Sequence, residues 1–415
     1  MHPKQGVIMW KKLKSYLSQL FKVYCHEFKI VIHDPGIIIF FLFLPLAYPV
    51  IYSLIYNPEL VRDVSVVVVD HDRSSLSREL VRNLDATQEA WIIGYAPDLP
   101  DARKAMDSHK CYGILEIPEG FEKNVVNGAQ GNAVLYCEMS LLLRYRSLLV
   151  AATNVAQALG AQIQTEKLDL TVPLAETIVH GDLMPVKNIT MGNIEGGFDS
   201  FIMPGVLILI LHQCIILAAG MAGGAKRERP ELTGYDSYNE MPSVLMTMWG
   251  QMLCYITILL VPIIYLVHYV PLMFSFPMAG NLFEILLFLL PMVFACVGLG
   301  WCVQGVVWER ESIFLLWVVT SVIFLFLSGL TWPRYAMPGI WKALSDCVPA
   351  TWGMEGYIRM NANGASLAQV RSDYINLWIL AGAYNIAAYC VQRWVVRPAV
   401  IKGYDAYQKT RNESI

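Results

Sequence analysis

The chain has little charge for its length. Only 16% of its 415 residues are charged and 55% are hydrophobic, whereas soluble domains carry about a quarter charged residues and about half apolar ones. The formal net charge of −3 at pH 7 is too small to indicate a polyanionic partner, so we expect no nucleic acid. The composition favours a protein embedded in a membrane.

The sequence also lacks the common motifs of catalysis and nucleotide binding. It contains no HExxH, no GxSxG and no Walker A pattern GxxxxGK[ST], which excludes the recognisable routes to metalloprotease, serine hydrolase and nucleotide-hydrolysing activity. We therefore expect no catalytic residue, no metal site and no cofactor in this chain. Any ATP-driven work would need another subunit that binds ATP and Mg²⁺.

The nine cysteines show no CxxC spacing, so neither a zinc site nor a thioredoxin-like site is indicated. Five of them lie inside apolar runs, where cysteine behaves as a small hydrophobe. Cys111 and Cys137 lie in a polar segment. They form a disulfide if that segment faces an oxidising compartment, or they are buried free thiols on strands.

About six apolar runs are long enough to cross a bilayer, which takes roughly 20 helical residues. They occupy residues 36–56, 200–222, 243–270, 282–307, 312–330 and 374–394, so that spans two to six fall within 200–395. Lys and Arg gather in the first 35 residues, in the 225–243 loop and in the 396–415 tail. With six spans these segments share one side, which we expect to be the cytoplasm, with both termini in it.

Residues 1–35 contain a predicted interfacial helix. Within residues 11–34, apolar side chains recur at helical spacing and lysines occupy the remaining face, a pattern typical of a helix lying on a membrane surface. A solvated helix packed against a partner is the alternative.

Residues 57–199 form a polar insert, placed outside the cytoplasm by the same topology. Expected strands at 64–70, 91–96, 111–118 and 133–138 alternate with helical segments, which indicates an α/β domain. The insert has 12 basic and 20 acidic residues, a net charge of −8, which disfavours docking on anionic lipid. Asp70, His71 and Asp72 end the first strand and could bind a cation, although a strand end followed by a helix cap is the commoner explanation.

We therefore expect a polytopic α-helical membrane protein of about six transmembrane helices with an inserted extracytoplasmic α/β domain. His212 and Gln213 lie midway along the second span. Polar side chains are costly in lipid, so these two either hydrogen-bond a neighbouring helix or line a substrate path.

The fifth apolar run breaks abruptly in "SGLTWPRYAMPGIW". Glycine and prolines end the helix there, and the freed backbone groups must be met by protein or water because lipid offers no partner. Residues 329–373 are therefore predicted to form an outer cap that folds back over the spans in short re-entrant pieces.

This segment resembles the signature SGxxxPxxxMP, followed by Pro-x-Thr and an Arg, of ABC-2 type transporter permeases. The matching positions are Ser328, Gly329, Pro333, Met337, Pro338, Pro349, Thr351 and Arg359. The order of parts is also similar, and "CYGILEIPEGFEKNVVNG" (111–128) is similar to a usual stretch of the family's insert. The subgroup that the chain most resembles is the permeases of multidrug and lipid-type efflux systems.

In that family the loop between spans two and three docks on a nucleotide-binding subunit. The resemblance places this coupling role in the 225–243 loop. Its candidate contacts are Arg227, Glu228, Arg229, Glu231 and Tyr235. The family's usual Gly-Thr-x-Glu is replaced here by "PELTGYDSYN".

The resemblance implies the permease subunit of an ABC exporter that moves a drug-like or lipid-like substrate out across the bacterial cytoplasmic membrane. Spans two and five would line the path, with His212, Gln213, Trp317 and Phe324 as candidates, and the cap would act as the exit gate. Implied partners are a separate ABC ATPase, a second permease copy or sister permease, membrane lipids and a periplasmic adaptor. The alternative is a membrane-anchored sensor or scaffold whose extracytoplasmic domain binds a ligand.

Overall fold

The structure is a computed structural model, and it describes residues 3–56, 61–168, 193, 197–229, 241–307 and 309–413. The chain divides into two compact units. The helical unit comprises Met1–Asn57 and Thr190–Ile415, and the inserted unit comprises Pro58–Ile189.

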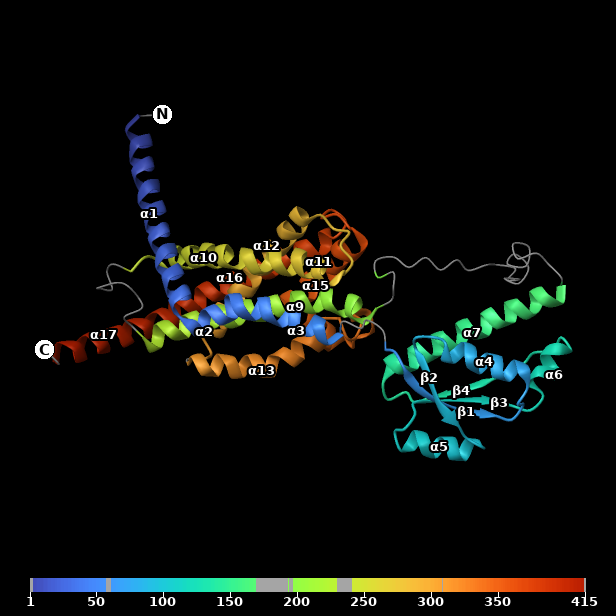
Figure 1. The fold of residues 1–415 in the computed structure, drawn as a ribbon. Coiled ribbons are helices and arrows are strands. Elements are labelled where there is room, and N and C mark those ends of the chain that lie inside the picture. The colour runs from blue at the N-terminus through green and yellow to red at the C-terminus, as the bar shows by residue number, and fades with distance from the viewer. Residues whose placement is uncertain are drawn as a thin grey trace. The chain divides into compact units, whose positions relative to one another are not determined.

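The helical unit is a bundle of long helices joined by short ones (Figure 1). Its first helices are α1 (Pro3–His33), α2 (Pro35–Ile38), the π-helix η1 (Ile39–Phe43), α3 (Leu44–Tyr56) and α9 (Phe198–Glu228). Next come α10 (Val244–Ile264), the π-helix η4 (Tyr265–Tyr269), α11 (Val270–Phe274), α12 (Leu282–Val303) and α13 (Arg310–Leu327). The last are the 3₁₀-helix η5 (Arg334–Ala336), α14 (Gly339–Asp346), α15 (Pro349–Asn363), α16 (Arg371–Val391), the π-helix η6 (Gln392–Val396) and α17 (Arg397–Glu413).

Asp34 lies between α1 and α2 and caps the start of α2. The Oδ1 atom of Asp34 accepts hydrogen bonds from the N–H groups of Gly36 at 3.0 Å and Ile37 at 3.2 Å, and Pro35 takes the first position of α2. Such a cap satisfies backbone donors that would otherwise lack partners. The chain thereby turns from α1, which projects from the bundle in Figure 1, into the helix α2–η1–α3.

The two faces of α1 have different surroundings. Val23 and Ile30 are buried against the bundle, whereas Tyr16, Leu17 and Phe21 are exposed. A helix therefore occupies the residues expected to be helical, and part of its apolar surface is left uncovered. The face that meets the bundle also contains the acidic residue Glu27.

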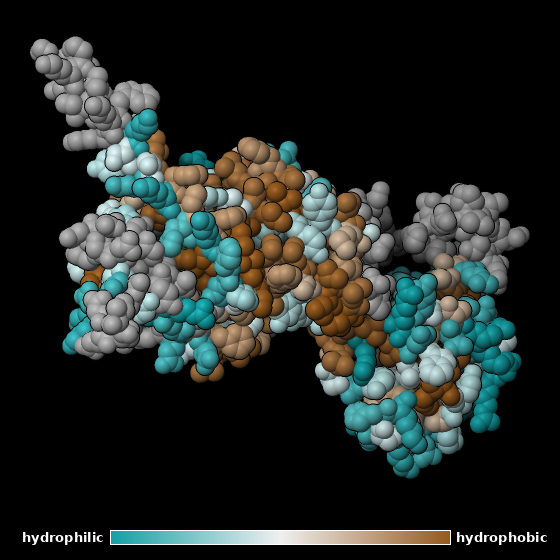
Figure 2. All heavy atoms as spheres, turned by 60° about the vertical axis from the view of Figure 1, so that its left-hand side comes forward, coloured by the Kyte–Doolittle hydropathy of each residue, from teal (hydrophilic) through white to brown (hydrophobic). Residues whose placement is uncertain are grey.

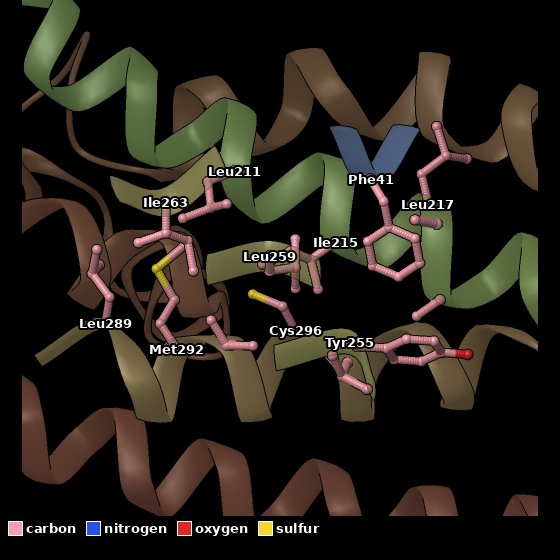
Figure 3. Packing of buried hydrophobic residues seen from close by; sticks show 14 of the residues in the cluster. Phe41, Leu211, Ile215, Leu217, Tyr255, Leu259, Ile263, Leu289, Met292 and Cys296 are labelled. Carbon is pink, nitrogen blue, oxygen red and sulfur yellow. The ribbon is translucent and has the colours of Figure 1, made fainter. Parts of the chain in front are cut away.

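The core of the helical unit surrounds α9, which is buried along most of its length and contacts α3, α12, α13 and α15. Figure 3 shows Leu211 and Ile215 of α9 meeting Leu259 of α10 and Met292 and Cys296 of α12. Interiors of this kind are close-packed, so a shift of one helix is felt by its neighbours.

Five of the described helical segments are long and apolar enough to cross a membrane. They are Pro35–Tyr56, Phe198–Glu228, Val244–Phe274, Leu282–Val303 and Arg371–Lys409. The run expected as the fifth span, 312–330, overlaps α13, whose apolar part Glu311–Leu327 is shorter than these five segments. Figure 2 shows a broad hydrophobic band across one face of the helical unit.

The inserted unit is built on a four-stranded sheet in the order β2-β1-β3-β4. Its elements are β1 (Val64–Asp70), α4 (Ser75–Asp85), β2 (Ala90–Tyr95), α5 (Leu99–Asp107), β3 (Gly113–Ile117), α6 (Phe121–Val126), β4 (Val134–Cys137) and α7 (Leu142–Leu168). The central strand β1 runs parallel to β2 and β3, and β3 pairs with β4 in the antiparallel sense. Each strand begins and ends within two residues of its predicted range.

The two faces of this sheet carry separate clusters of apolar side chains. Successive side chains of a strand point to opposite faces. Val66 and Val68 therefore pack with α4 and α7, while Val67 and Val69 pack with α5, the arrangement that Figure 1 shows. Cys111 belongs to the α5 cluster and Cys137 packs against the other, and both are free thiols.

Candidate functional site

A buried carboxylate joins three helices where α9 ends. Glu27 of α1 is 2% exposed. It accepts hydrogen bonds from the Tyr255 hydroxyl at 2.6 Å and from Gln251 Nε2 at 3.2 Å, both on α10. It also forms an ion pair with Lys226 in the last turn of α9. We call these four residues the Glu27 cluster.

Glycine lets α1 approach α10 closely enough to form this cluster. A Cβ atom at Gly250 would lie 2.6 Å from the side chain of Val23, which is closer than real Cβ contacts allow. Burying a carboxylate without partners would cost several kcal/mol. The partners from α9 and α10 therefore account for the presence of an acid at this interface.

A second polar contact lies beside the first. Gln304, 3% exposed, donates from Nε2 to the Ala219 carbonyl at 2.6 Å and accepts at Oε1 from Gln392 Nε2 at 2.7 Å. Its backbone carbonyl accepts from Arg227 Nη2 at 2.7 Å. A Cβ at Gly223 would lie 2.1 Å from the Gln304 side chain, so this helix contact requires glycine as well. The end of α9 is thus tied to α12 and η6.

The predicted coupling residues flank this region. Arg227 and Glu228 end α9, and the Arg229 N–H donates to the Ala225 carbonyl at 3.0 Å. Residues Glu231 and Tyr235 lie outside the described residues.

The other end of the 225–243 loop is held by a different helix. Pro242 accepts a hydrogen bond at its carbonyl from Arg397 Nη1 of α17 at 3.0 Å. Lys226 pairs with Glu27 of α1 at the loop's start. Both ends of the loop are therefore bonded to helices outside the α9–loop–α10 segment.

Three of the four predicted path residues meet where α9 packs on α13. The rings of His212 and Phe324 lie edge to face with centroids 5.2 Å apart, and Gln213 Nε2 donates to the Ser321 carbonyl at 3.3 Å. Trp317 lies on α13 and stacks on a ring of the same helix. Within the described residues, neither ring nitrogen of His212 has a hydrogen-bond partner, although its side chain is fully buried. This interface holds a polar group without a partner at mid-helix.

The fifth apolar run is followed by a turn, which is stabilised by contacts of Arg334. Gly329 has φ +89°, a conformation that favours glycine, and its missing Cβ would lie 3.1 Å from the Arg334 side chain. Arg334 donates to Glu355 at 2.6 Å, forms an ion pair with Asp346, and stacks with its guanidinium carbon 4.0 Å from the centroid of the Trp352 ring. One side chain thus links η5, α14 and α15.

The predicted prolines of the cap, residues 329–373, stand at helix boundaries. Pro333 precedes η5, Pro338 precedes α14, and Pro349 is the first residue of α15, while Met337 follows η5. Proline tolerates these positions because no helical N–H is needed there.

The remaining predicted cap residues make polar contacts. Ser328 Oγ donates to the Leu325 carbonyl at 2.6 Å, and Thr351 Oγ1 lies 3.4 Å from Ser345 Oγ. Arg359 donates to Asp373 at 3.0 Å, which joins α15 to α16. These residues therefore stabilise the fold of the cap.

Of the three candidate cation residues in the inserted unit, Asp70 and Asp72 accept backbone hydrogen bonds, and His71 Nε2 lies 4.0 Å from Glu116 Oε1. Asp70 Oδ1 accepts from the N–H groups of Asp72 at 3.0 Å and Arg73 at 2.8 Å. Asp72 accepts from the N–H groups of Gly120 at 2.8 Å and Glu122 at 3.0 Å, at the start of α6. Within the described ranges, no group of three His, Cys, Asp or Glu side chains is placed to hold a metal ion.

Sequence reasoning missed Glu27, Lys226 as its partner, Tyr255 and Arg334. Glu27 gave a weak signal as an acidic residue in a lysine-rich amphipathic helix. Lys226 belongs to a basic segment, and such a segment by itself indicates only the side of the membrane. Nothing local in the sequence indicates that these side chains meet.

Comparison with known proteins identifies the family. The sequence profile described as "ABC-2 family transporter protein" matches residues 35–390, which spans the helices from α2 to α16 and the inserted unit. None of the curated proteins compared with the chain matches it. The match covers most of the sequence and agrees with the resemblance carried by residues 328–359: the chain belongs to the ABC-2 family of transporter proteins.

Proposed function

We propose that the chain is the permease subunit of an ATP-binding cassette exporter, working with a second permease copy or a sister permease. It moves a hydrophobic or amphipathic substrate, drug or lipid-like, out across a bacterial inner membrane. The energy comes from a separate ATPase subunit that binds ATP and Mg²⁺. Membership of a transporter family and the lack of a nucleotide-binding motif in the sequence support this division of labour.

The Glu27 cluster is the observation that carries the proposal. The 225–243 loop docks on the ATPase, and Lys226 at its start pairs with Glu27 of α1 while Pro242 near its end bonds to Arg397 of α17. A pull on the loop is thereby passed to α1, α10 and α17 at once. Switches of this kind move packed helices between two discrete arrangements.

The movement reaches the proposed path through α9. His212 and Lys226 lie on the same helix, separated by roughly 21 Å at 1.5 Å per residue, with no proline between them. Displacement at Lys226 therefore changes the α9–α13 contact at His212, Gln213 and Phe324. Separation of the two helices exposes the His212 ring nitrogens, which can then bind a polar group of the substrate.

We place both termini and the 225–243 loop in the cytoplasm and the inserted unit outside it. In this arrangement α13 is the fifth of six spans, and the cap (329–373) closes the outer end of the path as its exit gate. The inserted unit receives or hands on cargo, with a periplasmic adaptor as a further partner.

The direct test is co-purification with an ATPase followed by an activity assay. The chain is expressed with the ATPase subunit of its transport system, purified and reconstituted in proteoliposomes. Arg229→Ala combined with Glu231→Ala is expected to reduce both the recovered ATPase and its activity. Lys402→Ala, an exposed charge on α17, is the control. A complex that forms equally well with the loop variant would contradict the coupling role of the loop, and a chain that hydrolyses ATP alone would overturn the proposal.

A further inference from the structure

The inserted unit contains a cavity of about 650 Å³ on the sheet face that α4 and α7 cover. Its walls come from α4, α6, strands β3 and β4, the segment 128–133 and α7, elements that Figure 1 shows around this face. Apolar side chains dominate the lining, among them Leu80, Leu84, Leu115, Phe121, Val155 and Leu159. The volume falls in the range of sites that hold small organic ligands.

The described part of the lining of the cavity is uncharged and mostly apolar. Among the described residues that form it, none is charged, and the polar side chains are the amides of Gln130, Asn132 and Gln164. An ion placed inside would lose its hydration without gaining a counter-charge. An apolar chain loses nothing by leaving water and gains contact with the leucines and valines of the wall.

Gly160 of α7 keeps part of this volume open. Glycine in a helix interior is destabilising relative to alanine, and it is usually explained by a close neighbour. At Gly113 of the same unit, a Cβ would lie 2.8 Å from Leu148. At Gly160 a Cβ would meet no described atom within 4 Å, and Gly160 lines the cavity. Packing within the described residues therefore does not require this glycine.

We propose that the cavity binds the alkyl chain of an amphipathic molecule, with the amides of Gln130, Asn132 and Gln164 close to the point where the chain meets its polar group. Gln130, Asn132 and Ala156 of the lining are exposed, so water reaches the cavity, and an alkyl chain that enters it removes the apolar wall from water. An alkyl chain fills it without needing any specific partner. The proposal does not rest on the proposed function, because the site would bind such a chain whether or not an ATPase is attached.

The test is photolabelling of the full chain in lipid nanodiscs with a diazirine analogue of palmitic acid. Mass spectrometry of the digested protein is expected to find label on peptides from α4, α6 and α7, and excess unlabelled palmitic acid is expected to suppress it. Label confined to the helical unit would overturn the proposal.

Substitutions at the lining test whether the label is bound inside the cavity. Gly160→Trp and Ala156→Trp, one helical turn apart on α7, both place an indole at the lining of the cavity. Loss of contact for even two methylene groups weakens binding roughly tenfold, so we expect at least that decrease in label for each variant. Gly160→Ala adds one methyl group, favours the helix and is expected to keep the label. Undiminished labelling in both tryptophan variants, with their circular dichroism unchanged, would overturn the site.

Discussion

The carboxylate of Glu27 is almost fully removed from water, so its hydrogen-bond partners are protein groups. Tyr255, Gln251 and Lys226 supply a hydroxyl, an amide and an ammonium group. Each of these comes from a helix other than α1. A substitution at Glu27 therefore tests two helix contacts at once, that of α1 with α10 and that of α1 with α9.

We expect Glu27→Ala to destabilise the helical unit. Removing one partner of a buried ion pair leaves the other charge uncompensated and costs about 3–5 kcal/mol. The melting temperature of the purified chain in nanodiscs should fall clearly. In the complex with the ATPase, substrate-stimulated ATP hydrolysis should fall while co-purification persists, because the loop itself is unchanged.

Two further variants sharpen this prediction. Lys22→Ala removes an exposed charge from the same helix and should change neither quantity. Glu27→Gln combined with Lys226→Met removes both charges and should recover much of the lost stability. A wild-type melting temperature in Glu27→Ala would show that the cluster contributes nothing.

The hydrogen bonds to Asp72 lead us to expect that the inserted unit loses stability at low pH. Partial burial acts to raise the pKa of its carboxyl group, but hydrogen bonds from Ser74 and from the backbone of Glu122, Gly120 and Phe121 outweigh it and lower that pKa below its ordinary value. A lowered pKa in the folded state gives stability that is present above the unfolded value of about 3.9 and is lost as the pH falls through the folded value.

Hydrogen exchange of the α6 amides in the full chain measures this effect. Exchange, corrected for its intrinsic pH dependence, should show weaker protection of Phe121–Val126 at about pH 3 than at about pH 6. Asp72→Ala should weaken protection at the higher pH by about 1 kcal/mol, the usual value of a helix cap, and should remove most of the pH dependence. Protection that is equal at both pH values in the wild-type chain would contradict the cap.

Elements with a strong local pattern could be predicted closely from the sequence. The strand expected at 64–70 is β1, residue for residue, because an apolar run bounded by turn residues needs only local chemistry. The ends of the apolar spans could be predicted less closely: the run expected at 312–330 extends beyond α13, which stops at Leu327, two residues before Gly329 with its positive φ. Helix α15 lies inside a segment expected only as short re-entrant pieces, because Pro349 and the polar residues of this helix mask the apolar pattern of its buried face.

Contacts between distant elements could not be predicted. Glu27 and Lys226 are 199 residues apart in the sequence, and each is ordinary in its own helix. The pairing of Arg334 with Glu355 and Asp346 likewise depends on how α14 and α15 fold back. Charge patterns locate such residues on an element but do not say which charges meet.

In the cap, we expect Arg334 to hold helices α14 and α15 together. Arg334 contacts two carboxylates and one aromatic ring, a geometry that lysine cannot reproduce. Arg334→Lys should loosen α14 and α15 by about 1–3 kcal/mol, the range for hydrogen bonds to charged groups. Hydrogen exchange should become faster in both helices and stay unchanged in α12. Tyr335→Ala, at an 88% exposed neighbour, should leave all three unchanged, and a similar profile for the two variants would refute the role of Arg334.

On the scale of the whole molecule, the chain combines a helical unit rich in apolar surface with an inserted unit that lies within residues 57–199, a region of net charge −8. Lys and Arg cluster instead at the first helix, at the end of α9 and in α17. Positively charged segments stay in the cytoplasm during membrane insertion. This asymmetry predicts that the inserted unit and α17 lie on opposite sides of the membrane.

Cysteine labelling in intact cells tests that arrangement. Lys123→Cys in the inserted unit and Lys402→Cys in α17 are both at exposed positions, and Cys347→Ser removes the exposed native thiol from the background. A membrane-impermeant maleimide added to intact spheroplasts should label the first variant and should label the second only after the membrane is opened. The Cys347→Ser parent should show little label in either state. Equal labelling of both positions in intact spheroplasts would place α17 and the inserted unit on the same side, and an even number of spans between them would then replace the proposed five.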